Sequence, residues 1–85
     1  MEIVKVEYLN GYRLGVEFGN NEKRVADFKH FLFQRHSPMT TQFRDIERFG
    51  KVYIEHGHLT WEDGQMDISA QSIYDNEFRP KLPAQ

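Results

Sequence analysis

The sequence contains no cysteine, and this absence excludes several chemistries at once. The 85-residue chain can form no disulfide, no thiolate nucleophile and no cysteine-ligated metal site. No uncharged apolar run approaches the roughly 18 residues that a membrane helix needs. Charges at Glu2, Lys5 and Glu7 interrupt the apolar N-terminus, so we expect neither a signal peptide nor a membrane anchor, and we predict a cytoplasmic protein.

What the sequence does contain is typical of one small globular domain. Hydrophobic residues make up 39% and aromatic residues 14% of the chain, which is too apolar for a disordered protein. We predict a single domain over residues 1–78. The last residues, 79–85, contain two of the three prolines and show no periodicity, so we predict a loose C-terminal tail.

The first third of the sequence alternates between apolar and polar residues, which is typical of strands with one buried face. Val4, Val6 and Tyr8 form the apolar side of the first run, and the turn dipeptide Asn10-Gly11 follows it. The apolar face of the second run consists of Tyr12, Leu14, Val16 and Phe18. Residues 23–28 form a third, shorter run.

Helical spacing replaces this alternation near Asp27. We predict a short helix over about residues 28–35, with Asp27 as its N-cap. Pro38 suits the first turn of a second helix, which Gly50 ends. The predicted inward stripe of this second helix consists of Met39, Phe43, Ile46 and Phe49.

Strand signals return in residues 51–56 and 58–62, and a last short helix is predicted within residues 70–78. The predicted order is therefore β-β-β-α-α-β-β-α. This order indicates an α+β fold, with an antiparallel sheet and short helices packed on one face.

Several segments together resemble a known family. The most specific is the block Trp61-x-x-Gly64-x-x-Asp67-Ile68, and the strand-to-helix segment Val25-Ala26-Asp27-Phe28 precedes it. Over about residues 3–75 the chain resembles the bacterial domain-of-unknown-function family 2442. The resemblance implies a compact α+β fold. It also implies an association with small toxin–antitoxin-like partners, and it assigns no catalytic residue.

Charge is distributed unevenly along the chain. Residues 23–51 hold seven Lys and Arg against three Asp and Glu, a net charge of +4, whereas the other residues sum to −6. A basic segment of this kind suits an acidic protein partner or a phosphate backbone. Phe33 departs from the apolar stripe of its helix, and we expect it to be exposed. The predicted binding residues are Phe33, Arg35, Arg44, Arg48 and Lys51.

Signals for catalysis are weaker. His56 and His58 are the best metal-ligand candidates, but Gly57 between them indicates a turn and no third histidine follows at a suitable spacing. We therefore interpret them as exposed hairpin residues and predict no metal and no cofactor. The chain also lacks a phosphate-binding loop and a Gly-x-Ser-x-Gly nucleophile motif.

These observations predict a small non-enzymatic protein-interaction module, of an antitoxin-like or regulatory kind. The predicted partner is another protein or a second copy of the chain, with no membrane partner. One alternative is a nucleic-acid-associated regulator that uses the basic segment 23–51. A second alternative is a small metal-dependent enzyme that uses His56, His58 and Asp63.

Overall fold

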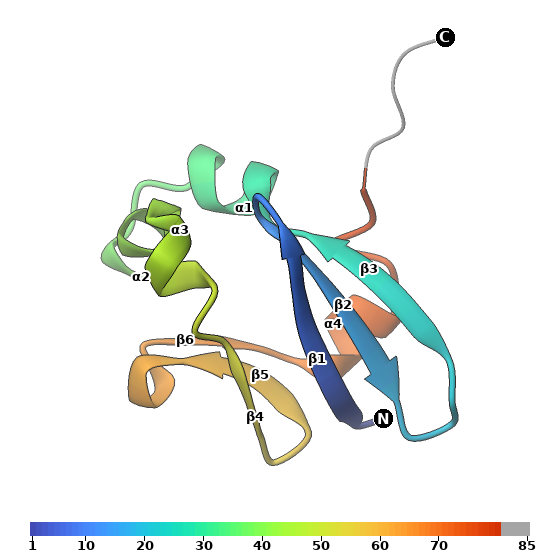
Figure 1. Ribbon diagram of the computed structural model, residues 1–85. Helices are drawn as coiled ribbons and strands as arrows, with labels where there is room; N and C mark the ends of the chain where they lie inside the picture. The colour runs from blue at the N-terminus through green and yellow to red at the C-terminus, as the bar shows by residue number, and fades with distance from the viewer. Residues whose placement is uncertain (81–85) are drawn as a thin grey trace, which may run out of the picture.

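Two antiparallel meanders form the framework of the molecule, which the computed structural model describes over residues 1–80 (Figure 1). Each meander is a three-stranded sheet, with strand orders β1-β2-β3 and β4-β5-β6. The strands are β1 (Ile3–Asn10), β2 (Arg13–Phe18), β3 (Lys23–Asp27), β4 (Tyr53–Glu55), β5 (His58–Trp61) and β6 (Met66–Ile68). The helices are α1 (Lys29–Gln34), α2 (Pro38–Thr41), α3 (Ile46–Phe49) and α4 (Ala70–Tyr74). Two 3-10 turns, Gln42–Arg44 and Glu62–Gly64, complete the set.

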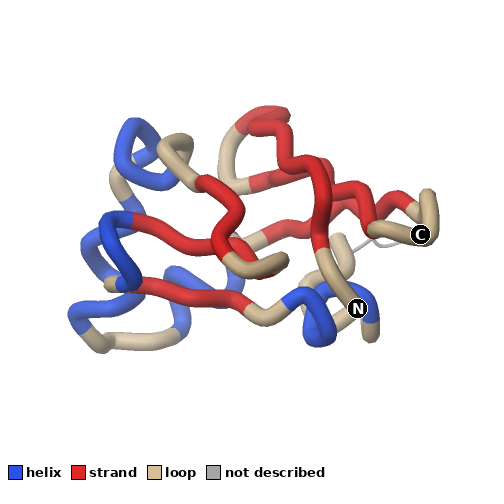
Figure 2. The backbone as a smooth tube through the Cα atoms, turned by 90° about the horizontal axis from the view of Figure 1, so that it is seen from below, coloured by secondary structure: helices blue, strands red, loops and turns tan. Residues whose placement is uncertain are grey.

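The predicted α+β class and the order of elements are confirmed, with one strand added. Met66 and Ile68 are buried on either side of exposed Asp67, and this three-residue run forms β6 beside β5. Periodicity did not reveal the strand because three residues are too few to distinguish alternation from a loop that leads into a helix. The strands lie side by side in the middle of the molecule, with the helical turns gathered mainly at one end (Figure 2). No helix of the described chain is long and apolar enough to cross a membrane.

A β-bulge changes which residues of β1 are buried. The register with β2 shifts between Ile3 and Lys5, so Ile3 enters the core and Val4 is 49% exposed. A second irregularity follows Tyr8, which is 38% exposed. The expected inward face was therefore wrong for Val4, because one extra residue in a strand reverses its alternation. Tyr8 keeps the phase of Val6 and pairs with buried Leu14, but it stands on the edge strand and stays partly exposed.

The segment from Pro38 to Phe49 is a series of short turns where one helix was predicted. Asp45 has an extended backbone and caps α3 by accepting a hydrogen bond from the backbone N–H of Glu47 at 3.0 Å. This break separates α3 from the preceding 3-10 turn. The apolar stripe is therefore only half inward: Phe43 and Phe49 are buried, whereas Met39 and Ile46 are exposed. Pro38 does begin α2, and Gly50 does cap α3, as predicted.

Trp61 is the aromatic centre of the core between the two sheets. Its ring lies 5.7 Å from Phe28 and from Phe49, and 6.1 Å from Phe43. Its indole Nε1–H donates a 2.7 Å hydrogen bond to the backbone carbonyl of Phe49. Phe28 also stacks on Phe78 at 4.4 Å, so the chain remains packed up to that residue. Arg79 and Pro80 follow outside any helix or strand, and residues 81–85 of the predicted tail lie outside the described residues.

Candidate functional site

Arg44, one of the predicted binding residues, is bound to the end of α1. Its Nε–H donates to the carbonyl oxygen of Leu32 at 2.8 Å, and its Nη2 donates to those of Phe33 at 3.3 Å and Arg35 at 3.0 Å. The last carbonyls of a helix have no partner within the helix. The guanidinium of Arg44 therefore acts as a C-terminal cap for α1, and most of its donors are used inside the chain.

Phe33 is held in place although its side chain is 43% exposed. The guanidinium carbon of Arg44 lies 4.9 Å from the centre of its ring, and the ring of Tyr12 meets it edge-on at 5.4 Å. The hydroxyl of Tyr12 in turn donates a hydrogen bond to the backbone carbonyl of Arg44. These contacts leave one face of an aromatic ring presented to solvent in a fixed position.

The five predicted binding residues do not converge on one surface. Phe33, Arg35 and Arg44 lie together at the end of α1, whereas Arg48 stands on α3. Arg48 donates hydrogen bonds to Oε1 of Gln42 at 2.8 Å and to Oε2 of Glu62 at 2.6 Å, which makes it part of a surface ion pair. Lys51 is exposed after α3 and has no ion pair among the described residues.

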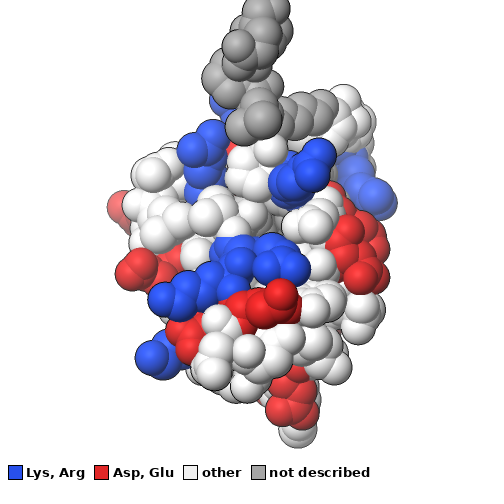
Figure 3. All heavy atoms as spheres, turned by 90° about the vertical axis from the view of Figure 1, so that its right-hand side faces the viewer, with Lys and Arg blue, Asp and Glu red and all other residues white. Residues whose placement is uncertain are grey.

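Basic and acidic side chains are interleaved on the surface. Figure 3 shows the side of the molecule that lies to the right in Figure 1, and there Lys and Arg lie directly beside Asp and Glu. Among the basic residues of segment 23–51, Arg48 is offset in this way, because it pairs with Glu62 from another part of the chain. On this side, the surface charge is therefore of mixed sign.

A groove of about 840 Å³ lies between α1 and the segment 77–79, and we call it the α1 groove. Its aromatic lining consists of Phe31, Phe33 and Phe78, and the rings of Phe31 and Phe78 are 5.3 Å apart. The groove exists because Phe28 stacks on Phe78 and thereby fixes the C-terminal segment beside α1. The remaining lining residues are Asp27, Lys29, His30, Gln34, Arg35, Glu77 and Arg79.

Most of the charged side chains at the rim of the α1 groove that have no ion pair in the described part of the chain are cations. Lys29, Arg35 and Arg79 are exposed and form no ion pair among the described residues. The carboxylate of Asp27 is already used: Arg13 pairs with its Oδ2 at 3.2 Å, and the backbone N–H of Lys29 donates to its Oδ1 at 3.0 Å. Arg35 also stacks on the ring of Phe31, at 4.8 Å. Glu77 adds one exposed carboxylate without an ion pair among residues 1–80, so the groove combines an aromatic floor with three cations and one carboxylate at its edge.

Sequence reasoning found only part of this groove. It singled out Phe33 and Arg35, but it placed Arg79 in the tail and gave Phe31 and Phe78 no role in binding. The missing information was the stacking of Phe78 on Phe28, which connects residues 50 positions apart. Periodicity within the predicted helix 70–78 gave no signal for such a contact.

His56 and His58 border the same hollow of about 510 Å³ as Asp63, at the β4–β5 hairpin. His56 has a positive φ of 53° and its side chain is 87% exposed, with Nε2 at 3.8 Å from Oε1 of Glu55. His58 is held against the start of α4, because its Nδ1 accepts a 3.2 Å hydrogen bond from the backbone N–H of Ala70. This hydrogen bond occupies the lone pair of Nδ1, which is then not available to a metal. Across residues 1–80 we find no group of three or more side chains placed to hold a metal ion.

Glu22 and Tyr74, away from the α1 groove, have pKa values shifted from their ordinary ones. A hydrogen bond from the Tyr74 hydroxyl, assisted by Asn20, lowers the pKa of Glu22. The same bond raises the pKa of Tyr74, because the phenolic proton is held by the carboxylate. Arg24 stacks over the Tyr74 ring at 5.0 Å. These side chains connect β3 with α4 and do not border the α1 groove.

Comparison with known proteins gives one match. The model of a family described as "Protein of unknown function (DUF2442)" matches residues 3–79. No curated protein matches the chain. No solved structure matches it either.

Proposed function

Because the chain belongs to the DUF2442 family of proteins of unknown function, its role is inferred from its own surface, and we propose that it is a small non-enzymatic module that binds another protein. We place the binding site in the α1 groove. The observation that carries this proposal is the fixed, 43% exposed ring of Phe33 beside the unpaired cations of the rim. Exposed aromatic and arginine side chains are the residue types that dominate protein interfaces.

The chemistry of the groove defines the partner. Phe31, Phe33 and Phe78 would receive apolar side chains, and Lys29 and Arg35 would pair with carboxylates on either side of them. The fitting ligand is therefore a peptide segment in which acidic and large apolar residues alternate. Because Tyr12 and Arg44 already hold Phe33 in place, little side-chain entropy is lost on binding. An antitoxin-like or regulatory role would follow where that segment belongs to a protein whose active surface it covers.

Defined peptides test the proposal directly. A fluorescein-labelled peptide with the core Glu-Leu-Glu-Phe-Glu should bind, and its counterpart with lysine in place of glutamate should not, as measured by fluorescence anisotropy. The variant Arg35→Glu should weaken binding at least tenfold. The matched control Lys51→Glu makes the same charge change outside the groove and should leave the affinity within about twofold.

Two outcomes would refute peptide binding in the α1 groove. Equal losses in Arg35→Glu and Lys51→Glu would show that net charge alone attracts the peptide. Failure of the acidic peptide to bind, together with binding of a DNA duplex whose affinity falls steeply with salt, would support the nucleic-acid alternative. An interface with an aromatic centre should instead show a shallow salt dependence, because most of its free energy comes from apolar burial.

A further inference from the structure

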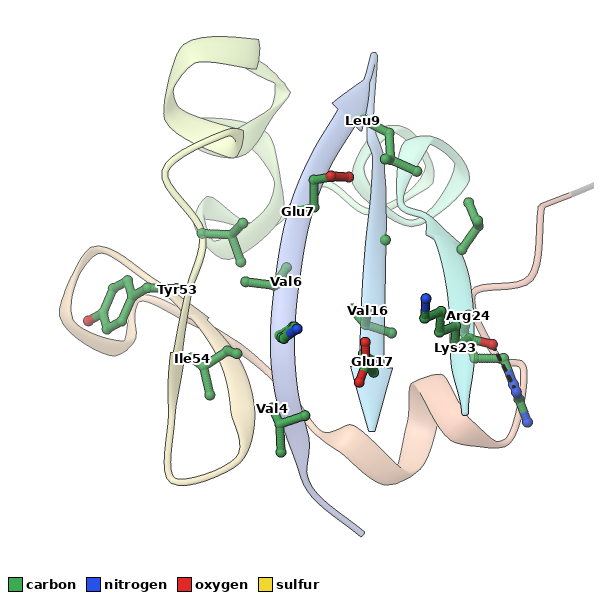
Figure 4. Close-up of a pocket in the computed structure, with 14 residues that line it drawn as sticks. Val4, Val6, Glu7, Leu9, Val16, Glu17, Lys23, Arg24, Tyr53 and Ile54 are labelled. Carbon is green, nitrogen blue, oxygen red and sulfur yellow. Dashed lines mark hydrogen bonds between the residues drawn. The ribbon is translucent and has the colours of Figure 1, made fainter. Parts of the chain in front are cut away.

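The outer face of the first sheet is open. Figure 4 looks onto this face, with Glu7 and Leu9 on β1, Glu17 on β2, and α4 behind the sheet. A shallow hollow of about 810 Å³ covers it and extends to Tyr53 and Ile54 of β4. Val4 is 49%, Leu9 39% and Val25 44% exposed on this surface. Apolar side chains this exposed on one sheet face suggest that another surface covers them.

The strand pairing arranges this open face in cross-strand rows. One row is Lys5, Glu17 and Lys23, and the next is Glu7, Gly15 and Val25. Val4 lies beyond the first row, near Gly19, and Leu9 lies beyond the second, with its side chain leaning over Gly15. Among residues 1–80, none of the four charged side chains in these rows takes part in an ion pair within 4.0 Å.

We propose that this open face binds a second copy of the same chain, face to face, around a two-fold axis. A two-fold interface requires a surface that is complementary to itself. The two rows carry two lysines and two glutamates and are therefore neutral. Arg24 also lines the hollow, but its guanidinium lies over the Tyr74 ring of α4. A neutral surface of mixed sign does not attract nucleic acid, but it can pair with an identical surface that has been turned around.

The pairing register of β1, β2 and β3 indicates where the two-fold axis lies. Let the axis run perpendicular to the strands, midway between the two rows. The row of Lys5 in one copy then faces the row of Glu7 in the second copy, and the reverse. Lys5 then faces Glu7 of the second copy, and Glu7 faces the second copy's Lys5. On the same strand, Val4 meets Leu9. On β2, the side chain of Glu17 lies over the second copy's Gly15, where no side chain occupies the space.

The size of the face predicts a weak dimer. Strands about 4.8 Å apart that rise about 3.3 Å per residue give a face of roughly 14 by 20 Å. A standard interface buries about 800 Å² on each partner, which here is about one-seventh of the 5542 Å² accessible surface. Even with β4 included, the open face is smaller than this standard. We therefore expect a dissociation constant above about 1 µM.

Charge exchange tests the arrangement in sedimentation velocity experiments with the full chain from about 1 µM to about 1 mM. The variants Lys5→Glu and Glu7→Lys each place like charges opposite one another, so each should dimerise at least tenfold more weakly than the parent. Mixing these two variants should restore association, because each glutamate again faces a lysine. The double variant Lys5→Glu/Glu7→Lys should behave like the parent. Lys51→Glu is the control outside the face.

Either of two results would overturn the proposal. One is a parent chain that remains monomeric up to about 1 mM. The other is a mixture of the two single variants that associates no better than either alone, which would assign the face to a different occupant. Circular dichroism establishes that each variant is folded. The peptide experiment with Arg35→Glu concerns a different surface, so either proposal can fail without the other.

Discussion

Arg44 offers the sharpest test of how this fold is held together. Its guanidinium donates to three carbonyls at the end of α1 and also lies over the ring of Phe33. We therefore expect Arg44→Ala to release the C-terminal turn of α1 and to destabilise the whole domain. Arg44→Lys should recover only part of the loss, because an ammonium cannot reach three carbonyls in one plane.

The magnitude follows from the surroundings of each bond. The half-buried bond to Leu32 is a charged hydrogen bond, which contributes about 1.5–3 kcal/mol. The other two bonds are exposed, where water replaces the donor, so each adds only about 0.5 kcal/mol. The expected total is about 2.5–4 kcal/mol. A domain of 85 residues has a free energy of unfolding of roughly 4–13 kcal/mol, so this loss is a large fraction of it.

Urea denaturation followed by the fluorescence of Trp61 measures this loss. The matched control is Arg48→Ala, which removes an arginine from an ion pair whose side chains are 37% and 35% exposed. That pair should contribute only about 0.2–1 kcal/mol. Equal midpoints for Arg44→Ala and Arg48→Ala would refute the capping role, since both variants lose one positive charge.

Three further predictions rest on single contacts. Gly57→Ala should destabilise the fold by about 1–2 kcal/mol in urea denaturation, because Gly57 has a φ of +79° and an added Cβ would lie 2.8 Å from Cγ of Glu2; an unchanged midpoint would contradict this. Tyr74→Phe should return the pKa of Glu22 toward 4.5 in an NMR titration. Because the folded pKa of Glu22 is lowered, its stabilisation is present above pH 4.5 and is lost as the pH falls through the folded pKa, so the variant should lose that dependence. Trp61→Phe should reduce the free energy of unfolding by about 2–4 kcal/mol, measured by circular dichroism, since it leaves a cavity and an unpaired buried carbonyl.

Sequence periodicity predicted the fold class because most of the signals were local. The face formed by Leu14, Val16 and Phe18 is buried as expected, and Gly50 does end α3. Errors arose where one residue changed the phase of a pattern. The bulge after Ile3 exposed Val4, and the extended backbone of Asp45 broke a predicted helix. Neither event has a distinctive residue type.

The candidate site was less predictable because its parts are far apart in sequence. Residue type alone suggested that Arg44 binds a partner, yet its donors are used by the carbonyls of α1. The same reasoning placed Phe78 at the very end of the domain without a role, although it forms part of the groove floor. Long-range stacking of this kind is decided by packing, which a single sequence does not display.

The position of Trp61 has a consequence for how the molecule unfolds. The strands of the second sheet have only three or four residues, too few to persist without a surface to pack on. That surface is supplied by Phe28, which links β3 to α1, and by Phe49 of α3, both 5.7 Å from the indole ring. Unfolding of either sheet would remove the aromatic contacts on which the other depends, so we expect neither sheet to unfold alone. The domain should therefore lose its structure in a single cooperative transition, and the one tryptophan reports on all of it.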